Sequence, residues 1–163
     1  MEMSTPQKEH KGLEKFLGEW TSEAEMNTEP GKPAEKCLGT ESVRSLGGLW
    51  ILADGRGDMP GGGGPATMML TLGYDPQRKR FVGTWIGSMM THLWVYAGAL
   101  DAAERVLTLD AEGPSMAAPD SKMARYRDVI EFKSDDYRVL TSHMLGDDGT
   151  WHHFMTAHYR RKK

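Results

Sequence analysis

Asp128 is the side chain with the clearest capacity for chemistry in this sequence. Side chains alternate between Lys122 and Lys133, so that Asp128 shares one face of a predicted strand with apolar and aromatic residues. A carboxylate on such a face must be ion-paired, hydrogen-bonded or protonated. It can therefore orient a ligand or act as an acid. The alternative is a structural role, in which Asp128 bonds water or a neighbouring strand in a wet interior.

Histidine is the second candidate, because four of the six histidines lie in the last predicted hairpin: His143, His152, His153 and His158. A four-residue loop at 146–149 would place His143 opposite His152. His152 and His158 cannot share an ion, since six strand residues separate them by about 20 Å. A metal site would need the His143–His152 pair and a third ligand such as His92, whereas haem needs one proximal histidine. We expect no metal and no cofactor, with haem as the alternative.

Aromatic side chains gather in one predicted hairpin, whose turn is Met89-Met90. In this register Trp85 lies opposite Trp94, and Tyr96 lies opposite a glycine. The large rings share one face, and small or branched side chains occupy the other. The pattern indicates either a wall of a ligand pocket or an ordinary core, and alternation alone does not say which face points inward. The predicted ligand-binding residues are Trp85, His92, Trp94, Tyr96, Asp128 and His143.

The elements that must position these residues are mostly strands. A short helix comes first, because Ser4 or Thr5 can cap it and Pro6 suits its first position. Its apolar residues recur with helical spacing up to Leu17, and Gly18 ends it. Alternation and turn residues then predict ten strands, at 18–26, 35–46, 49–56, 66–74, 80–88, 91–100, 106–112, 122–133, 137–145 and 150–160.

Short connections predict that each strand pairs with the next in an antiparallel, up-and-down order. Ten twisted strands with one apolar face must either close or split into two sheets. We predict an all-β fold: a closed antiparallel up-and-down barrel of about ten strands, with the short N-terminal helix capping one end. The whole chain, 1–163, is expected to form one domain, in which 1–11 is a polar arm and the start of the helix. A barrel of this size leaves a lumen.

Composition excludes several classes of protein. The net charge is −3 and the pI is near 6.1, so the chain has no electrostatic basis for binding nucleic acid or an anionic membrane. No apolar stretch approaches a membrane span, and the N-terminus does not resemble a signal peptide. The single cysteine, Cys37, excludes an internal disulfide and a cysteine zinc site, which favours a cytoplasmic location. The 12 Met, 5 Trp and 5 Tyr compensate for scarce aliphatic residues.

Several motifs resemble a known family. Gly18-Glu19-Trp20, directly after the predicted helix, is similar to the Gly-x-Trp opening of lipocalin-like (calycin) barrels. The more specific motifs are Leu72-Gly73-Tyr74-Asp75-Pro76, the run from Arg80 to Ile86, and Tyr159-x-Arg161-Lys162. Over nearly the whole chain these residues resemble the bacterial domain-of-unknown-function family 1579. The resemblance implies a lipocalin-like barrel, and it brings no activity and no catalytic residues.

These observations predict a binding protein, with a small apolar or aromatic molecule in the barrel lumen. The first alternative is a haem-binding barrel with a lumenal histidine, since the haem-binding nitrobindins are similar in their Gly-x-Trp opening and ten-stranded barrel. Their ligand-bearing C-terminal pattern is not clearly matched in this chain. The second alternative is a cofactor-free isomerase or lyase that uses Asp128 with a histidine. In the third, the barrel faces serve only to form a homo-oligomer, around a lumen filled by Met and Trp.

Overall fold

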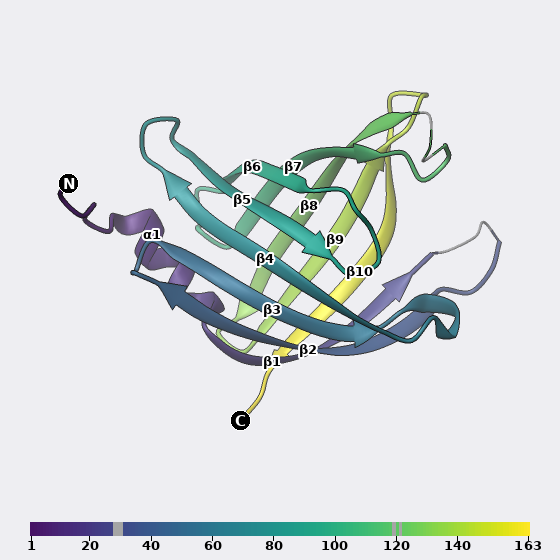
Figure 1. Cartoon of the computed structure of the whole chain (residues 1–163), viewed down its shortest axis with the longest axis horizontal. Helices are drawn as coiled ribbons and strands as arrows, with labels where there is room; N and C mark the ends of the chain where they lie inside the picture. Colours follow the sequence, from purple (N-terminus) through teal and green to yellow (C-terminus); the bar gives the residue numbers. More distant parts are fainter. Residues whose placement is uncertain (28–30, 119, 121) are drawn as a thin grey trace.

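The computed structural model describes residues 1–27, 31–118, 120 and 122–163, and its strands form a closed antiparallel barrel (Figure 1). Each strand pairs with its neighbours in sequence, and β1 closes the barrel against β10. The predicted all-β up-and-down barrel is confirmed. Its strands are β1 (Gly18–Met26), β2 (Glu35–Leu46), β3 (Trp50–Asp58), β4 (Pro65–Asp75), β5 (Arg80–Gly87), β6 (Trp94–Leu100), β7 (Val106–Pro114), β8 (Met123–Ser134), β9 (Tyr137–Leu145) and β10 (Trp151–Arg161).

Strand alternation defines the inner face of the barrel. Trp20 of β1 is fully buried, and its neighbours Glu19 and Thr21 are exposed. Residues directly opposite one another on neighbouring strands point to the same side of the barrel. Trp20 lies opposite Glu41 of β2 and Arg161 of β10, so these two residues also belong to the inner face. Two charged residues therefore share the inner face with the indole, and the interior is not purely apolar.

A short helical segment covers one end of the barrel, as predicted. It consists of α1 (Lys8–Gly12) and a 3-10 turn, η1 (Leu13–Phe16). A second 3-10 turn, η2 (Pro60–Gly62), follows β3. Leu13 and Phe16 are buried, and the Phe16 ring meets Phe132 of β8 edge to face at 4.9 Å. The helical segment thus seals the barrel end through its own apolar side chains.

The predicted start of the helix is wrong. Gln7, rather than Ser4 or Thr5, is the N-cap residue. The cause is the buried His10, whose Nδ1 accepts a hydrogen bond of 2.9 Å from the Gln7 backbone N–H. Its Nε2–H then donates to the carbonyl oxygen of Tyr74 at 3.0 Å. One imidazole therefore both caps the helix and ties it to β4.

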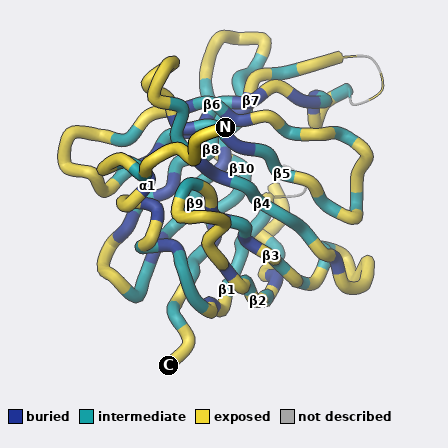
Figure 2. The backbone as a smooth tube through the Cα atoms, turned by 60° about the vertical axis from the view of Figure 1, so that its left-hand side comes forward, coloured by how far each residue is buried: buried dark blue, intermediate teal, exposed yellow. Residues whose placement is uncertain are grey.

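The two halves of the interior are filled differently. In the half next to the helix the inward side chains are buried; they include Leu13, Phe16, Trp20, Val43, Ile51, Leu72, Phe81, Leu107, Ile130 and Phe132. In the other half, several inward residues keep intermediate exposure; they include Ala24, Met68, Leu70, Trp85, Met144 and Met155. Smaller or hydrogen-bonded inward residues of this half are buried, including Cys37, Ala66, Tyr126 and Ser142. Figure 2 shows buried backbone within the strands and exposed backbone in loops and terminal segments. One half of the barrel is a packed core, and the other keeps a lumen that water reaches.

β6 is the shortest strand, and it begins at Trp94 rather than at the predicted residue 91. Residues 88–93 form the connection instead of a two-residue turn; in it the Ser88 N–H donates to the Thr67 carbonyl oxygen of β4 and the Met90 N–H donates to that of Gly87. The ladder between β6 and β7 covers only four residue pairs, from Ala97 to Leu100 on β6. Among the described residues, β6 and β7 have no further backbone pairs toward the open end.

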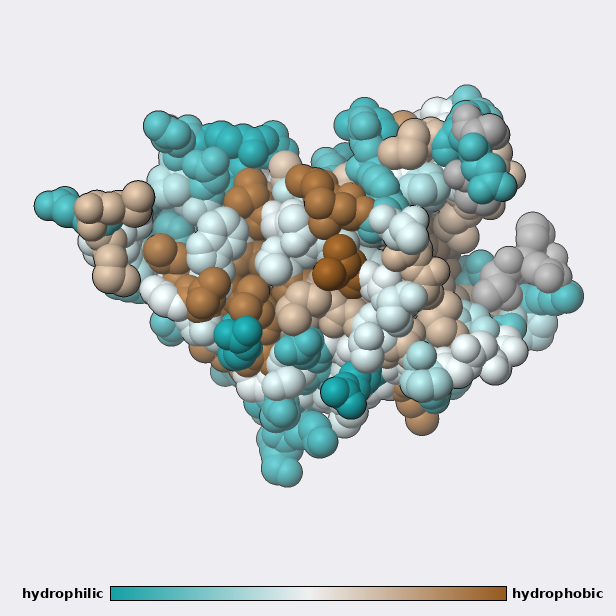
Figure 3. Space-filling model, viewed as in Figure 1, coloured by the Kyte–Doolittle hydropathy of each residue, from teal (hydrophilic) through white to brown (hydrophobic). Residues whose placement is uncertain are grey.

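The outer surface also carries apolar residues. Ile86, Leu93 and Val95 are 50%, 53% and 59% exposed on and beside β5 and β6. Figure 3 shows hydrophobic atoms gathered near the middle of its view of the barrel. Within the described part of the chain, no helix is long and apolar enough to cross a membrane.

Candidate functional site

The aromatic face of the β5–β6 hairpin points into the barrel. Trp85 lies opposite Trp94 and Gly83 lies opposite Tyr96, which confirms the predicted register. Tyr96 is buried, and the two indoles pack against the core while keeping intermediate exposure. Val95, of the opposite parity, is exposed. The rings therefore form one wall of the lumen, and the structure decides the question that alternation left open.

Trp94 and His92 fill the wall where β6 and β7 lack backbone pairs. The indole covers Gly113 of β7 so closely that a Cβ at that position would overlap the ring. Its Nε1–H donates to the Met90 sulfur at 3.0 Å, and His92 Nε2–H donates to the Glu112 carbonyl oxygen at 2.8 Å. The His92 ring packs edge-on against Trp94 at 4.8 Å. Side chains, rather than a backbone ladder, close this part of the wall.

Asp128 lies on the inner face of β8, as predicted, and forms a polar centre in the lumen. The Tyr96 hydroxyl donates to Asp128 Oδ2 at 2.5 Å, and the Ser142 side chain gives a second hydrogen bond. Ser142 is directly opposite Asp128 on β9. No ion pair among the described residues includes Asp128. Neutral hydroxyl groups alone hold its carboxyl group.

Burial governs the protonation of this centre. Removal from water raises the pKa of Asp128, and the hydrogen bonds from Tyr96 and Ser142 offset part of that rise. Burial, and then the neighbouring Asp128 charge, raise the pKa of Tyr96 well above its ordinary value. The Tyr96 hydroxyl therefore stays protonated and donates a hydrogen bond to the carboxyl group of Asp128. The arrangement suits a group that orients a ligand.

The Asp128→Asn substitution is expected to stabilise the protein at neutral pH, by an amount on the order of 1 kcal/mol. Because the native pKa of Asp128 is raised, the native state binds this proton more tightly, and the ionised carboxylate disfavours folding. The titratable groups around it are Tyr96 on β6, His143 on β9 and Tyr159 on β10.

The sign of this effect fixes its pH dependence. The advantage of Asp128→Asn should be complete above the native pKa, and should disappear as the pH falls below about 3.9, the value for an unfolded chain. Urea unfolding of both proteins over this range measures the difference. An advantage that grows toward acidic pH would contradict the expectation.

The floor of the lumen is an ion pair that the sequence did not reveal. Arg138 of β9 and Glu41 of β2 pair over the intervening strands, with side chains only 4% and 11% exposed. The guanidinium carbon lies 4.1 Å from the ring centroid of Tyr159 and 4.5 Å from that of Trp20. Arg138 lies opposite Phe132 and Glu41 lies opposite Trp20, so the pair belongs to the packed half beneath the lumen.

The remaining polar side chain of the floor is Tyr159. Burial, and then the charge of Glu41, raise the pKa of its hydroxyl, and Arg138 opposes the rise. Asp128 raises it further, so the electrostatic influence of the floor and of the Asp128 centre overlaps. The alternation of Arg138 with Leu140 and Ser142 was the sequence signal for an inward arginine.

His143 lies on the outer face of the barrel, apart from the other predicted site residues. Its partners are Arg127 on β8 and His153 on β10, and the two imidazole rings are 5.3 Å apart. The predicted pairing with His152 is wrong, because the loop holds five residues, 146–150, rather than four. Desolvation, and then the neighbouring His153, lower the pKa of His143.

The histidines named in the predicted metal site lie apart from one another: His92 is at the rim, His143 is on the outer face of β9, and His152 is at the start of β10. The described residues contain no group of three or more His, Cys, Asp or Glu side chains that could hold a metal ion. His92 has its Nε2 engaged at the rim, and His152 folds back to within 3.2 Å of Asp148 Oδ1. These residues do not fit a haem ligated by a free lumenal imidazole. Among the described residues, no histidine is hydrogen-bonded to Asp128.

The lumen opens at the end opposite the helix. There β2, β3 and the loop after β3 line an open hollow of about 590 Å³; its charged residues are Glu35, Lys36 and Asp58. Cys37, also in the lining, lies on the inner face of β2 and is buried. The hollow therefore adjoins the inner face of the barrel.

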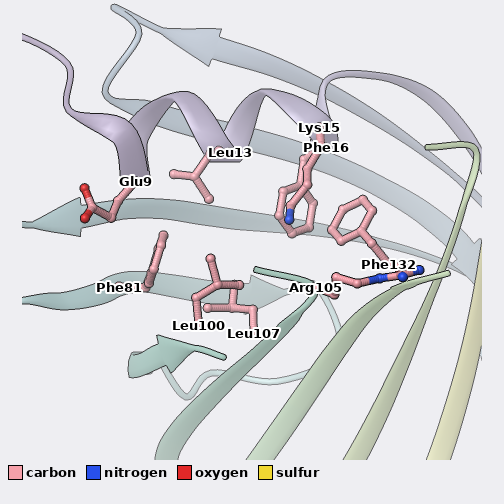
Figure 4. A pocket seen from close by; sticks show the side chains of 10 residues that line it. Glu9, Leu13, Lys15, Phe16, Phe81, Leu100, Arg105, Leu107 and Phe132 are labelled. Carbon is pink, nitrogen blue, oxygen red and sulfur yellow. The ribbon is translucent and has the colours of Figure 1, made fainter. Parts of the chain in front are cut away.

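A small hollow with a cavity volume of about 20 Å³ lies under the helix (Figure 4). Its walls are apolar, from Leu13, Phe16 and Phe132 among others. The cations at its rim are engaged, since Lys15 Nζ donates to the Glu104 carbonyl oxygen at 2.7 Å and Arg105 donates to that of Phe132. This hollow is a packing seam between the helix and the strand ends.

Solved structures share this architecture at low sequence identity. Rv2717c from M. tuberculosis gives a TM-score of 0.63 at 13% identity, covering 98% of this chain and 100% of that one. The S-type phycobiliprotein lyase CPES from Guillardia theta gives 0.57 at 15%, covering 97% and 99%. EF1p2_mFAP2b bound to DFHBI gives 0.51 at 12%, covering 95% and 100%. These likenesses show the barrel fold alone. No curated protein matches the sequence.

The sequence itself assigns the family. Residues 5–161 match the family described as protein of unknown function DUF1579. The match includes the helix, all ten strands and the motifs around Tyr74 and Trp85. The chain therefore belongs to the DUF1579 family of proteins of unknown function.

Proposed function

We propose that the lumen binds a small apolar or aromatic molecule. The observation that carries this proposal is the uneven filling of the barrel. Most inward side chains next to the helix are buried, whereas the large Met and Trp side chains of the other half, including Met68, Trp85 and Trp94, keep intermediate exposure. If the lumen served only as a core, Met and Trp would close-pack it to the same density as the helix end. Exposed apolar surface inside a barrel is stabilised by an apolar guest.

The chemistry of the wall supports the same proposal. Trp85 and Trp94 offer ring surface, and the Asp128 centre adds a small number of oriented polar groups. An apolar cavity with a few convergent polar groups is the usual composition of a small-molecule site. A barrel of similar fold, EF1p2_mFAP2b, is described as bound to DFHBI, which shows that this architecture can hold a small molecule.

We also propose that binding needs no cofactor and takes place in the cytoplasm. Cys37 is buried on the inner face beside the mouth, and burial raises the pKa of its thiol. A protonated, buried thiol is unreactive, and a reducing compartment keeps it so.

A neutral aromatic probe tests the proposed function. The protein should enhance the fluorescence of N-phenyl-1-naphthylamine with a micromolar Kd, because the probe leaves water for the apolar lumen. Trp85→Ala should weaken this binding about tenfold through the lost ring contact. Trp50→Ala removes an indole on the outer face and should leave binding unchanged. Absence of enhancement, or equal losses in both variants, would overturn the proposal.

A further inference from the structure

We propose that the ligand of the lumen is a cation: a protonated amine carried on an aromatic or apolar body, with its ammonium group on Asp128. This inference rests on the proposed function and adds the charge and chemical class of the guest. The three observations behind it are the charges of the inner face, the free acceptor capacity of Asp128, and the charges at the mouth.

Among the described charged residues deep in the barrel, Asp128 is the one without an ion-pair partner. Glu41 and Arg138 neutralise each other in the floor. Arg161 pairs with Asp136 at 3.3 Å, and it also donates to the Leu17 and Lys15 carbonyl oxygens. Asp128 has only hydroxyl partners. An ionised carboxylate in that position favours a guest that brings the missing positive charge.

The neighbouring cation does not serve this role. Arg127 forms an ion pair with Asp110 on the outer face, where its Nε lies 2.8 Å from Asp110 Oδ1. Its guanidinium also covers the Trp151 ring at 4.4 Å. Alternation turns Arg127 away from the lumen although it is adjacent to Asp128 in sequence. The carboxylate and this cation are therefore on opposite sides of the barrel wall.

Asp128 also has acceptor capacity to spare. An ionised carboxylate offers about four lone-pair positions, and the hydroxyls of Tyr96 and Ser142 occupy two of them. The positions that remain suit the N–H groups of an ammonium ion. The indoles of Trp85 and Trp94 on the same face of the barrel add ring surface, which attracts organic cations.

The mouth of the barrel, the hollow lined by β2, β3 and the loop after β3, is negatively charged like Asp128. Glu35 and Asp58 line the hollow at the open end. Lys36, the cation in that lining, lies 3.3 Å from Glu23 Oε1 and 3.9 Å from Glu25 Oε1 on the outside of β1. The mouth is thus acidic, and an acidic rim concentrates cations and repels anions.

Three naphthalene derivatives of nearly equal size test the inference by isothermal titration calorimetry. They are 2-naphthylmethylamine, 2-naphthylmethanol and 2-naphthylacetate, which are cationic, neutral and anionic at neutral pH. The wild-type protein should bind the amine at least about tenfold more tightly than the alcohol, because a charged hydrogen bond exceeds a neutral one by that amount. The carboxylate should bind more weakly than the alcohol.

Two variants attribute the preference to one residue. Asp128→Asn keeps the shape of the side chain and should reduce affinity for the amine to that for the alcohol, without changing the affinity for the alcohol. Asp110→Asn removes a carboxylate from the outer face of the neighbouring strand and should keep the preference. A wild-type protein that binds the alcohol as tightly as the amine, or an Asp128→Asn protein that retains the preference, overturns this inference and leaves the proposed function standing. Failure of all three compounds and of the neutral probe overturns the proposed function itself.

Discussion

Arg138→Met is expected to lower the free energy of unfolding by about 3–5 kcal/mol, the usual cost of removing one partner from a buried ion pair. The substitution leaves the Glu41 carboxylate buried without its cation. It also removes the guanidinium from the rings of Trp20 and Tyr159. Arg138 Nη1 has no hydrogen-bond partner among the described residues, so these aromatic faces add to the ion pair in stabilising the guanidinium.

The double variant Glu41→Gln/Arg138→Met should recover much of that loss, since it leaves no charge in the floor. Arg127→Met is the matched control on the outer face. Its side chain is 36% exposed and its partner Asp110 is 34% exposed, so its loss should cost no more than about 1 kcal/mol. Urea denaturation followed by fluorescence and circular dichroism gives the four free energies. If Arg138→Met is as stable as Arg127→Met, the Arg138–Glu41 pair does not stabilise the barrel as described.

Gly98→Ala is expected to destabilise the barrel by about 4 kcal/mol or more, which is exceptional for the addition of one methyl group. Gly98 of β6 lies between Phe81 of β5 and Leu109 of β7. A Cβ at this position would overlap the carbonyl oxygen of Thr108, and backbone cannot give way as a flexible side chain can. The methyl group would have to separate β6 from β7, where only four residue pairs hold the strands together.

Gly57→Ala supplies the control for this prediction. Gly57 is also a strand glycine on the inner face, and the nearest atom to a Cβ there is the Leu38 carbonyl oxygen at 3.4 Å, an ordinary contact. Its effect should stay within about 1 kcal/mol. Thermal unfolding of both variants distinguishes them. Similar melting temperatures for the two proteins would show that β6 and β7 can part at little cost.

Alternation predicted most of the fold and part of the site. It placed Trp85 opposite Trp94, and Tyr96 and Asp128 on apolar faces, although the turn before β6 is longer than predicted. The strand period of two explains this success, because a change in loop length that preserves register leaves every side chain on its own face. The inward direction of the ring-bearing face could not be predicted, since it depends on closure of the whole barrel.

The errors come from effects that act outside strand periodicity. One additional loop residue moved His143 from His152 to His153. His10, a residue with no part in the predicted pattern, moved the start of the helix to Gln7 by accepting its N–H. The Arg138–Glu41 pair joins residues from opposite ends of the chain, and no local pattern specifies such a contact. The Tyr96–Asp128 hydrogen bond depends in the same way on strands that are not neighbours.

The short ladder between β6 and β7 has a kinetic consequence. A closed barrel resists opening because no strand has a free edge. In this barrel, however, β6 and β7 are paired along only part of their length. Separation of β6 from β7 at the unpaired end displaces the contacts of Trp94 with Gly113 and of His92 with Glu112. It breaks no pair of the β6–β7 ladder. Local opening of this end is therefore expected to be faster than global unfolding, which must also separate the packed half of the barrel.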